Sequence, residues 1–238
     1  MIDIHCHLLP NIDDGPTSWE ESLELARMYD GEGIQTAVTT PHWIKGSPWE
    51  PDPNQVIEMV AVLNEKTKAE NIPLKILPGM EVGMTDNLIE LLNNRSVLTL
   101  GGGSHILLES PFTSMPYKIE ELIVRLQQMG ITTILAHPER CQEVQSNPKR
   151  LESMVESGAL IQITSSSLLG HFGLKPKVCA TWIARHGLIH LIASDAHSPT
   201  NRPPLFREPL SILREIIGPE ATRTLEERTY NIISNNNK

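Results

Sequence analysis

Met1-Ile2-Asp3-Ile4-His5-Cys6-His7 opens the chain, and this stretch decides how the rest of the sequence is interpreted. Its apolar residues predict a buried strand over Ile2–His5. Residues i and i+2 of an extended strand point to the same face, so His5 and His7 project together from the end of this strand. Two imidazoles in this position can hold a divalent metal ion, although a solitary His-x-His spacing is a weak signal.

Six further β-rich runs follow, and helix-like segments separate them along the whole chain. The expected strands are Thr36–Thr40, Lys75–Pro78, Ile106–Leu108, Thr133–Ala136, Leu160–Ile163 and Ile189–Ala193. Thr17-x-x-Glu20 predicts a capping box for a helix through about Tyr29, and Asp52-Pro53 predicts the start of a helix through about Ala69. Seven strand–helix units favour one α/β domain over residues 1–238, a distorted (β/α)7 TIM-like barrel rather than an open sheet.

Polar residues able to bind metal follow strand after strand, at the end where such a barrel carries its active site. They are His5, His7, Asp14, His42, Glu81, Glu109, His137, Asp195 and His197. Asp195-Ala196-His197 repeats the i, i+2 spacing of the first pair, whereas His105, His186 and His190 are expected to be structural. His171 follows the sixth strand, and its role stays open. Five imidazoles and four carboxylates exceed the needs of one tetrahedral ion and suit two or three ions of Mn, Fe or Zn.

Several of these residues also have an ordinary structural reading when each is considered alone. Glu81 and Glu109 could be capping or solvated acids, which is the commoner role of a single glutamate. Asp14 could brace the turn before Gly15-Pro16, and His42 could be a loop histidine packed near Trp43. The metal hypothesis therefore depends on their joint position at one end of the predicted barrel.

Two arginines lie close in sequence to the candidate ligands. Arg140 follows His137 by three residues, and Arg202 follows His197 by five. Guanidinium groups bind phosphate oxygens in a bidentate manner, but they also form ordinary surface salt bridges. Clustered metal ions lower the pKa of a bound water, so the pattern favours hydrolysis of a phosphate ester by attack of a metal-bridging hydroxide. Hydrolysis of an amide or imine on a similar barrel would need no arginine pair.

The overall composition narrows the class of protein. A net charge of −9 argues against broad binding to nucleic acid or anionic lipid, and no run approaches the roughly 18 to 20 apolar residues of a membrane span. The three cysteines (Cys6, Cys141 and Cys179) lack CxxC spacing, which predicts a cytoplasmic protein. With 4% aromatic residues the chain offers no obvious stacking surface, so recognition is expected to depend on phosphate and metal alone. The sequence is compatible with a monomer or an oligomer.

Taken together, these motifs resemble the polymerase and histidinol phosphatase (PHP) superfamily. The closest likeness is to the bacterial manganese-dependent protein-tyrosine phosphatases of capsule and exopolysaccharide gene clusters, and it runs from Met1 to about Asn231. The motifs that carry it are His5-x-His7, Ile12-Asp13-Asp14-Gly15-Pro16, Thr40-Pro41-His42, Gly79-Met80-Glu81, Ile134-Leu135-Ala136-His137-Pro138-Glu139-Arg140, Ala193-Ser194-Asp195-Ala196-His197 and Arg202-Pro203-Pro204.

This resemblance implies a PHP fold, three divalent ions, with manganese the first choice, and a phosphotyrosine protein as substrate. That substrate would be the tyrosine-rich tail of a bacterial kinase in polysaccharide biosynthesis. The implied partition gives one ion to His5, His7, Glu81 and Asp195, a second to Glu81, Glu109 and His137, and a third to Asp14, His42 and His197. Arg140 and Arg202 would bind the phosphate and act in catalysis.

Three other functions remain compatible with the sequence. One is a small-molecule phosphatase of the same superfamily that acts on histidinol phosphate or a nucleotide. Another is nucleolytic trimming, against which the acidic balance of the chain weighs. A third, from a different class, is a non-catalytic module that binds metal or a phosphorylated tail.

Overall fold

Parallel strands form the centre of the protein, whose computed structural model describes residues 1–234. One sheet has the order β1 (Ile2–Cys6), β2 (Thr36–Thr39), β4 (Lys75–Pro78). The other has the order β3 (His42–Trp43), β5 (Glu81–Gly83), β6 (His105–Glu109), β7 (Thr132–Ala136), β8 (Leu160–Thr164), β9 (Leu191–Ala193). All strand pairs within both sheets are parallel, as the alternation of strands and helices predicts.

Two strands are interrupted, and each continues from the first sheet into the second. Only Thr40 and Pro41 separate β2 from β3, and only two residues separate β4 from β5. Across this interruption the Gly79 amide donates to the Thr39 carbonyl (3.0 Å), and the Glu81 amide donates to the Pro41 carbonyl (3.1 Å). A Cβ atom on Gly79 would lie 2.9 Å from the Val38 side chain, so the close approach of these strands requires glycine.

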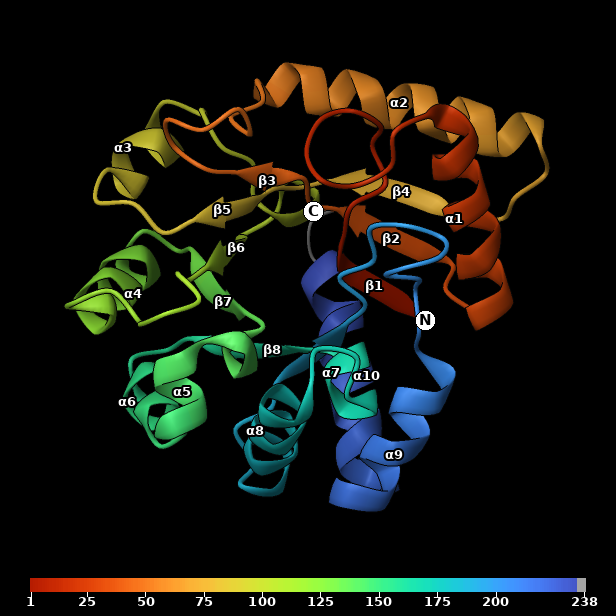
Figure 1. Cartoon of the computed structure of the whole chain (residues 1–238). Helices are drawn as coiled ribbons and strands as arrows, with labels where there is room; N and C mark the ends of the chain where they lie inside the picture. The colour runs from red at the N-terminus through yellow and green to blue at the C-terminus, as the bar shows by residue number, and fades with distance from the viewer. Residues whose placement is uncertain (235–238) are drawn as a thin grey trace.

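Hydrogen bonds also bring the first strand beside the segment that follows the last one. The Asp195 amide donates to the His5 carbonyl (2.9 Å), the His7 amide donates to the Ala196 carbonyl (2.8 Å), and Cys6 pairs with Ala196 in a parallel bridge. Within residues 1–234 the strands therefore occupy seven successive positions, with helices around them (Figure 1). The expected TIM-like α/β fold is confirmed.

Helices lie mostly between successive strands. They are α1 (Trp19–Glu32), α2 (Pro53–Ala69), α3 (Leu88–Asn93), α4 (Ile119–Gln128), α5 (Gln142–Ser146), α6 (Arg150–Glu156), α7 (Ser165–Leu169), α8 (Leu174–Arg185), α9 (Arg207–Ile217) and α10 (Pro219–Ser234), with 3-10 turns η1 (Leu100–Gly102) and η2 (Pro138–Arg140). None of these helices in residues 1–234 has both the length and the apolar character that crossing a membrane requires.

The local start signals are confirmed at one helix and shifted at another. Asp52 caps α2 by accepting from the Asn54 amide (2.8 Å), and this helix ends at Ala69 as predicted. The capping box of α1 begins one residue later than the predicted Thr17, because Ser18 accepts from the Glu21 amide (3.3 Å). Glu21 in turn accepts from the Thr17 amide (2.6 Å), so the expected box was wrong by one position.

Two apolar clusters stabilise this arrangement. The larger lies between the strands and the surrounding helices. The smaller joins inner strand residues, among them Ile4, Leu107 and Leu191, to Ile232 and Ile233 of α10. Helix α10 contacts both β1 and β9 (Figure 1), so its last turns fill the interior beneath the strand ends. Each fully buried aliphatic side chain contributes about 1.5–3 kcal/mol, which gives the polar strand ends a rigid support.

Candidate metal centre

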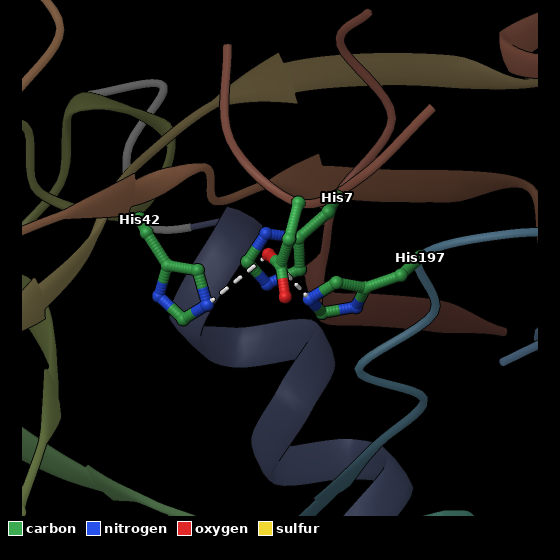
Figure 2. A group of neighbouring side chains, drawn as sticks. His7, His42 and His197 are labelled. Atoms are coloured by element: carbon green, nitrogen blue, oxygen red, sulfur yellow. Dashed lines mark ion pairs between the residues drawn. The ribbon is translucent and has the colours of Figure 1, made fainter. Parts of the chain in front are cut away.

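The ends of successive strands bring all nine candidate ligands into one cluster. Within residues 1–234 the ligand atoms form three groups in which every atom lies within 4.8 Å of the others. The groups are His7, Asp14, His42 and His197; His5, Glu81, His137 and Asp195; and His42, Glu81 and Glu109. Since His42 and Glu81 each belong to two groups, the three groups are continuous. Figure 2 shows the rings of His7, His42 and His197 turned toward one another.

The strand interruptions place two of these side chains differently from the sequence-based expectation. His42 is the first residue of β3 and Glu81 the first residue of β5, whereas the sequence predicted both just beyond the end of a strand. That expectation was wrong because the second and third strands resume after a break of two residues. The two residues are direct neighbours in the parallel ladder between β3 and β5, which fixes their separation.

Glu81 occupies the middle of the cluster. Its Oε2 atom lies 3.1 Å from His5 Nε2, 3.1 Å from His42 Nδ1 and 3.4 Å from His7 Nε2. Its other oxygen, Oε1, lies 2.8 Å from His137 Nε2. A carboxylate surrounded in this way has the position of a ligand shared between ions. Glu81 is fully buried, so water cannot take the place of these contacts.

Many ligand atoms of the cluster are buried without a hydrogen-bond partner. Within residues 1–234 they are His5 Nε2, His7 Nε2, His42 Nδ1, Glu81 Oε2, Asp195 Oδ1 and His197 Nε2. A buried polar atom left unsatisfied costs about 1–3 kcal/mol, so a fold rarely keeps several of them together. Cations placed among these atoms would satisfy all of them at once. The nitrogen and oxygen donor set therefore fits divalent metal ions.

The rings of His5 and His7 are oriented by acceptors behind them. His5 Nδ1 lies 2.8 Å from Gln162 Oε1, and His7 Nδ1 lies 2.6 Å from Asp13 Oδ2. These contacts place the ring proton on Nδ1 and turn the Nε2 lone pair toward the cluster. Sequence reasoning missed both acceptors, although Asp13 adjoins Asp14 and Gln162 stands out as a polar residue in an apolar strand.

Two of the candidate ligands have unusual backbone conformations. His137 has φ 32° and Asp195 has φ 54°, and each follows directly or closely after a buried strand. Residues other than glycine rarely occupy this left-handed region, and this conformation costs them of order 1–3 kcal/mol. Such strain occurs mostly at functional sites, and here it turns both side chains back into the cluster.

The two arginines meet at the edge of the cluster. Asp195 Oδ2 accepts from Arg140 Nη1 (2.7 Å) and from Arg202 Nη2 (2.5 Å). The other oxygen of the same carboxylate, Oδ1, lies 3.4 Å from His5 Nε2 and 3.6 Å from His7 Nε2. Asp195 therefore joins the guanidinium pair to the ligand cluster, so an anion bound at the metal edge would meet both arginines.

Comparison with known proteins identifies the group to which this chain is related. The family model for capsular polysaccharide synthesis, CpsB/CapC, matches residues 1–233. The chain belongs to the CpsB/CapC family. It is 39% identical to the tyrosine-protein phosphatase YwqE of Bacillus subtilis, over 99% of this chain and 92% of that protein. It is 30% identical to the tyrosine-protein phosphatase CpsB of Streptococcus pneumoniae, over 94% of each.

Solved structures agree with this membership. A chain from the crystal structures of B. subtilis YwqE and S. pneumoniae CpsB, described as unique metal-dependent tyrosine phosphatases, superposes with a TM-score of 0.95. It has 39% sequence identity, with 99% of this chain and 95% of that chain covered. The lactonase Lmo2620 of Listeria monocytogenes shares the fold, with a TM-score of 0.53 and 12% identity. The predicted resemblance to metal-dependent tyrosine phosphatases is confirmed.

Burial and charge set the protonation of the cluster in this CpsB/CapC family member. Burial lowers the pKa of His137 and of His197 to about 4, so both rings are neutral at pH 7, the form that binds metal. Burial also lowers the pKa of His5, but the Glu81 and Asp195 carboxylates outweigh it and leave that pKa raised. Burial and the Glu81 charge raise the pKa of Glu109 to about 8.

The remaining histidines and Cys6 are not members of the three ligand groups. His105 begins β6, His186 caps the end of α8, and His190 directly precedes β9. His171, whose role the sequence left open, is exposed in the turn after α7. The buried Cys6 thiol donates to the Val38 carbonyl (3.4 Å), away from the ligands, and burial raises its pKa well above the usual value.

Proposed function

We propose that this chain is a metal-dependent phosphomonoesterase that removes phosphate from phosphotyrosine proteins. The observation that carries the proposal is the cluster of unpartnered buried ligand atoms with two arginines at its edge. Donors of this kind suit divalent cations, and guanidinium pairs suit phosphate. The names of the CpsB and YwqE relatives support a tyrosine phosphatase over other phosphatases.

The proposed ligands are the nine residues of the cluster, and we propose three divalent ions, with manganese as the first choice. They are His5, His7, Asp14, His42, Glu81, Glu109, His137, Asp195 and His197. The geometric groups place His7 with Asp14, and His137 with His5. The family resemblance instead implies His7 with His5, and His137 with Glu109. Both rings lie within reach of either group, since His7 Nε2 is 3.4 Å from Glu81 and His137 Nε2 is 3.7 Å from Glu109.

In the proposed reaction the chain binds and orients the phosphoryl group. Bound divalent ions would supply a nucleophile from water at neutral pH and offset charge on the phosphoryl oxygens. Arg140 and Arg202 each donate one N–H group to Asp195, and Arg202 Nη1 also lies 3.9 Å from Asp14 Oδ2. The remaining guanidinium N–H groups would bind the phosphate. The phenolate of tyrosine has a conjugate acid pKa of about 10, so it leaves more readily than an alkoxide. No cysteine nucleophile is needed.

The proposed substrate is the phosphorylated tyrosine-rich tail of a bacterial tyrosine kinase in capsule or exopolysaccharide biosynthesis. The description of the family model, capsular polysaccharide synthesis, supports this setting. We also propose that the protein works in the cytoplasm. Its three cysteines are free and buried, as is usual in a reducing compartment.

A phosphatase panel with elemental analysis tests the proposal. Purified protein in Mn²⁺ should hydrolyse a phosphotyrosyl peptide faster than histidinol phosphate or a nucleotide monophosphate. Arg140→Lys and Arg202→Lys should each lower kcat by about 10²–10³, because a positioned donor to the phosphoryl group is lost. Arg223→Lys, at an exposed position of α10, is the matched control. Preference for histidinol phosphate would support the small-molecule alternative, and stoichiometric peptide binding without phosphate release would establish a binding module.

A further inference from the structure

Two phenylalanines from distant parts of the chain lie beside Arg140. The Arg140 guanidinium carbon is 4.9 Å from the ring centre of Phe112 and 4.4 Å from that of Phe172. The guanidinium carbon of Arg202 is 5.7 Å from the same Phe172 ring. The sequence, with 4% aromatic residues, predicted no obvious stacking surface. Folding nevertheless brings two of its three phenylalanines to one arginine.

These rings line an open groove next to the candidate metal centre. The groove has a volume of about 510 Å³, and Phe112, Arg140, Phe172, Leu174 and Lys175 are among its lining residues. Arg140 connects it to the cluster, because the same side chain donates to Asp195. The Phe112 ring also stacks on His137 at a centroid distance of 6.2 Å and an interplanar angle of 20°. A phosphate on the two arginines would therefore have its ester group beside these rings.

The fold fixes these rings near Arg140 without burying them. Phe112 keeps 47% of its surface exposed, although it lies against a buried ligand. Glu139, next to Arg140, accepts from the Thr164 amide (2.9 Å) and the Ser167 hydroxyl (2.7 Å). This carboxyl therefore holds the start of α7, which leads into Phe172, against the arginine turn. Aromatic surface that is fixed in place and left open is typical of binding sites.

Another aromatic side chain at the cluster, Trp49, is a weaker candidate for this role. Its ring stacks on His42 at 5.3 Å with an interplanar angle of 14°. Within residues 1–234 no arginine lies over its ring, whereas Arg140 lies over the rings of Phe112 and Phe172. The arrangement that combines open ring surface with a phosphate-binding group is therefore the one around Arg140.

We propose that Phe112 and Phe172 form a subsite for the phenyl ring of the phosphotyrosyl residue. The inference rests on the proposed phosphatase function and deepens it by naming what selects aryl over alkyl phosphates. Aromatic rings attract one another in offset or edge-to-face arrangements at centroid distances of about 4.5–7 Å. Both rings lie against the Arg140 guanidinium, so a substrate ring whose phosphate binds Arg140 and Arg202 would pack beside them in the groove. A phosphoserine side chain would reach the arginines but leave the rings uncovered.

The test compares two peptides of identical sequence that carry either phosphotyrosine or phosphoserine. The variants are Phe112→Leu and Phe172→Leu, which keep an apolar side chain, and Tyr117→Leu is the control at an 89% exposed aromatic position. In Mn²⁺ the ratio of kcat/KM for phosphotyrosine over phosphoserine should fall about three- to tenfold in each test variant. It should stay unchanged in the control. Comparing ratios between variants cancels the intrinsic difference in leaving group.

An equal loss for both peptides would overturn the inference, because it would show that the rings only support Arg140. An unchanged ratio would also overturn it. Binding of two peptides with non-hydrolysable groups, phosphonomethylphenylalanine or an aliphatic phosphonate, separates this inference from the proposed function. If the wild-type protein hydrolyses no peptide, the phosphatase proposal fails. The binding of the two non-hydrolysable peptides then tests the ring subsite by itself. An aryl preference that Phe172→Leu abolishes then supports the ring subsite, and equal binding of both peptides refutes it.

Discussion

Asp13→Asn tests whether the hydrogen bond between Asp13 and the His7 ring supports metal binding by the cluster. Asp13 is buried and accepts from three donors: its Oδ2 from the His7 ring (2.6 Å) and the His42 amide (3.0 Å), its Oδ1 from the Gly15 amide (2.9 Å). Asparagine has nearly the same shape but replaces one oxygen with an NH₂ group. In either orientation of the asparagine amide, its NH₂ group faces at least one N–H donor that Asp13 accepted from.

The geometry sets the expected size of the effect. Loss of an acceptor behind a metal-binding histidine costs about 10- to 100-fold in metal affinity, or roughly 1.4–2.8 kcal/mol. A buried donor left without an acceptor costs the metal-free protein a further 1–3 kcal/mol, approximately, in free energy of unfolding. Because Asp13 itself is not a proposed ligand, excess Mn²⁺ should restore most of the activity of the variant.

The assay is a titration of metal-free protein with Mn²⁺ in competition with a chelator of known affinity, combined with urea unfolding. Asp52→Asn is the matched control, since Asp52 makes the same chemical contact, to the Asn54 amide, at an exposed helix start. Asparagine caps helices as well as aspartate, so this control should keep both its metal affinity and its stability.

A folded Asp13→Asn protein with wild-type affinity for Mn²⁺ would refute the reasoning. It would show that the acceptor on His7 Nδ1 does not support metal binding by this cluster. A loss of activity that excess Mn²⁺ fails to restore would point instead to a direct role of Asp13 in the reaction.

Further outcomes follow from the same contacts. Dialysis against EDTA should lower Tm by about 5–10 °C, because free metal at a concentration about 100 times its Kd stabilises the folded protein by about 2.7 kcal/mol. Scanning calorimetry with and without Mn²⁺ checks this, and an unchanged Tm would contradict a metal centre. Cys6→Ser should leave kcat unchanged, since the thiol contacts the Val38 carbonyl; loss of turnover with full metal content would contradict the mechanism. Burial raises the pKa of Glu139 to about 7, so between pH 4.5 and 7 the folded protein keeps a proton that the unfolded chain has released. The free energy of unfolding should therefore fall by up to about 3 kcal/mol as pH rises through this window, and Glu139→Gln should remove that loss. If the wild-type and Glu139→Gln proteins gave parallel curves of unfolding free energy against pH, this prediction would be wrong.

Local signals in the sequence predicted the elements, and one topological rule predicted the cluster. Apolar runs and the Asp52-Pro53 start depend on neighbouring residues alone, and both agree with the structure. Ligand convergence followed from the rule that parallel strands end on one face. The strand breaks were not predicted, because the resumption of β3 at His42 depends on its ladder to β5, which is set by residues almost forty positions away.

The residues that sequence reasoning missed all act through contacts between distant segments. Gln162 accepts from His5 across 157 positions, and Phe172 meets Arg140 through packing of separate loops. No spacing in the chain marks such a pair, since either residue alone is compatible with an ordinary core or surface position. Asp13 was visible as half of an acidic pair, but only the fold shows that it supports His7 whereas Asp14 faces the cluster.

A second buried network explains how the first and last strands keep their ligands in register. Asp3 accepts from the Tyr29 hydroxyl (2.9 Å), the Ser194 hydroxyl (2.5 Å) and the Ser194 amide (3.2 Å). The Ser194 hydroxyl also accepts from the Ala196 amide (3.1 Å). These contacts tie β1, two residues before His5, to the residues on both sides of Asp195. The strained backbone of Asp195 is therefore held by neutral and charged hydrogen bonds behind the cluster, which leaves its carboxylate free to face the ligands and the arginines.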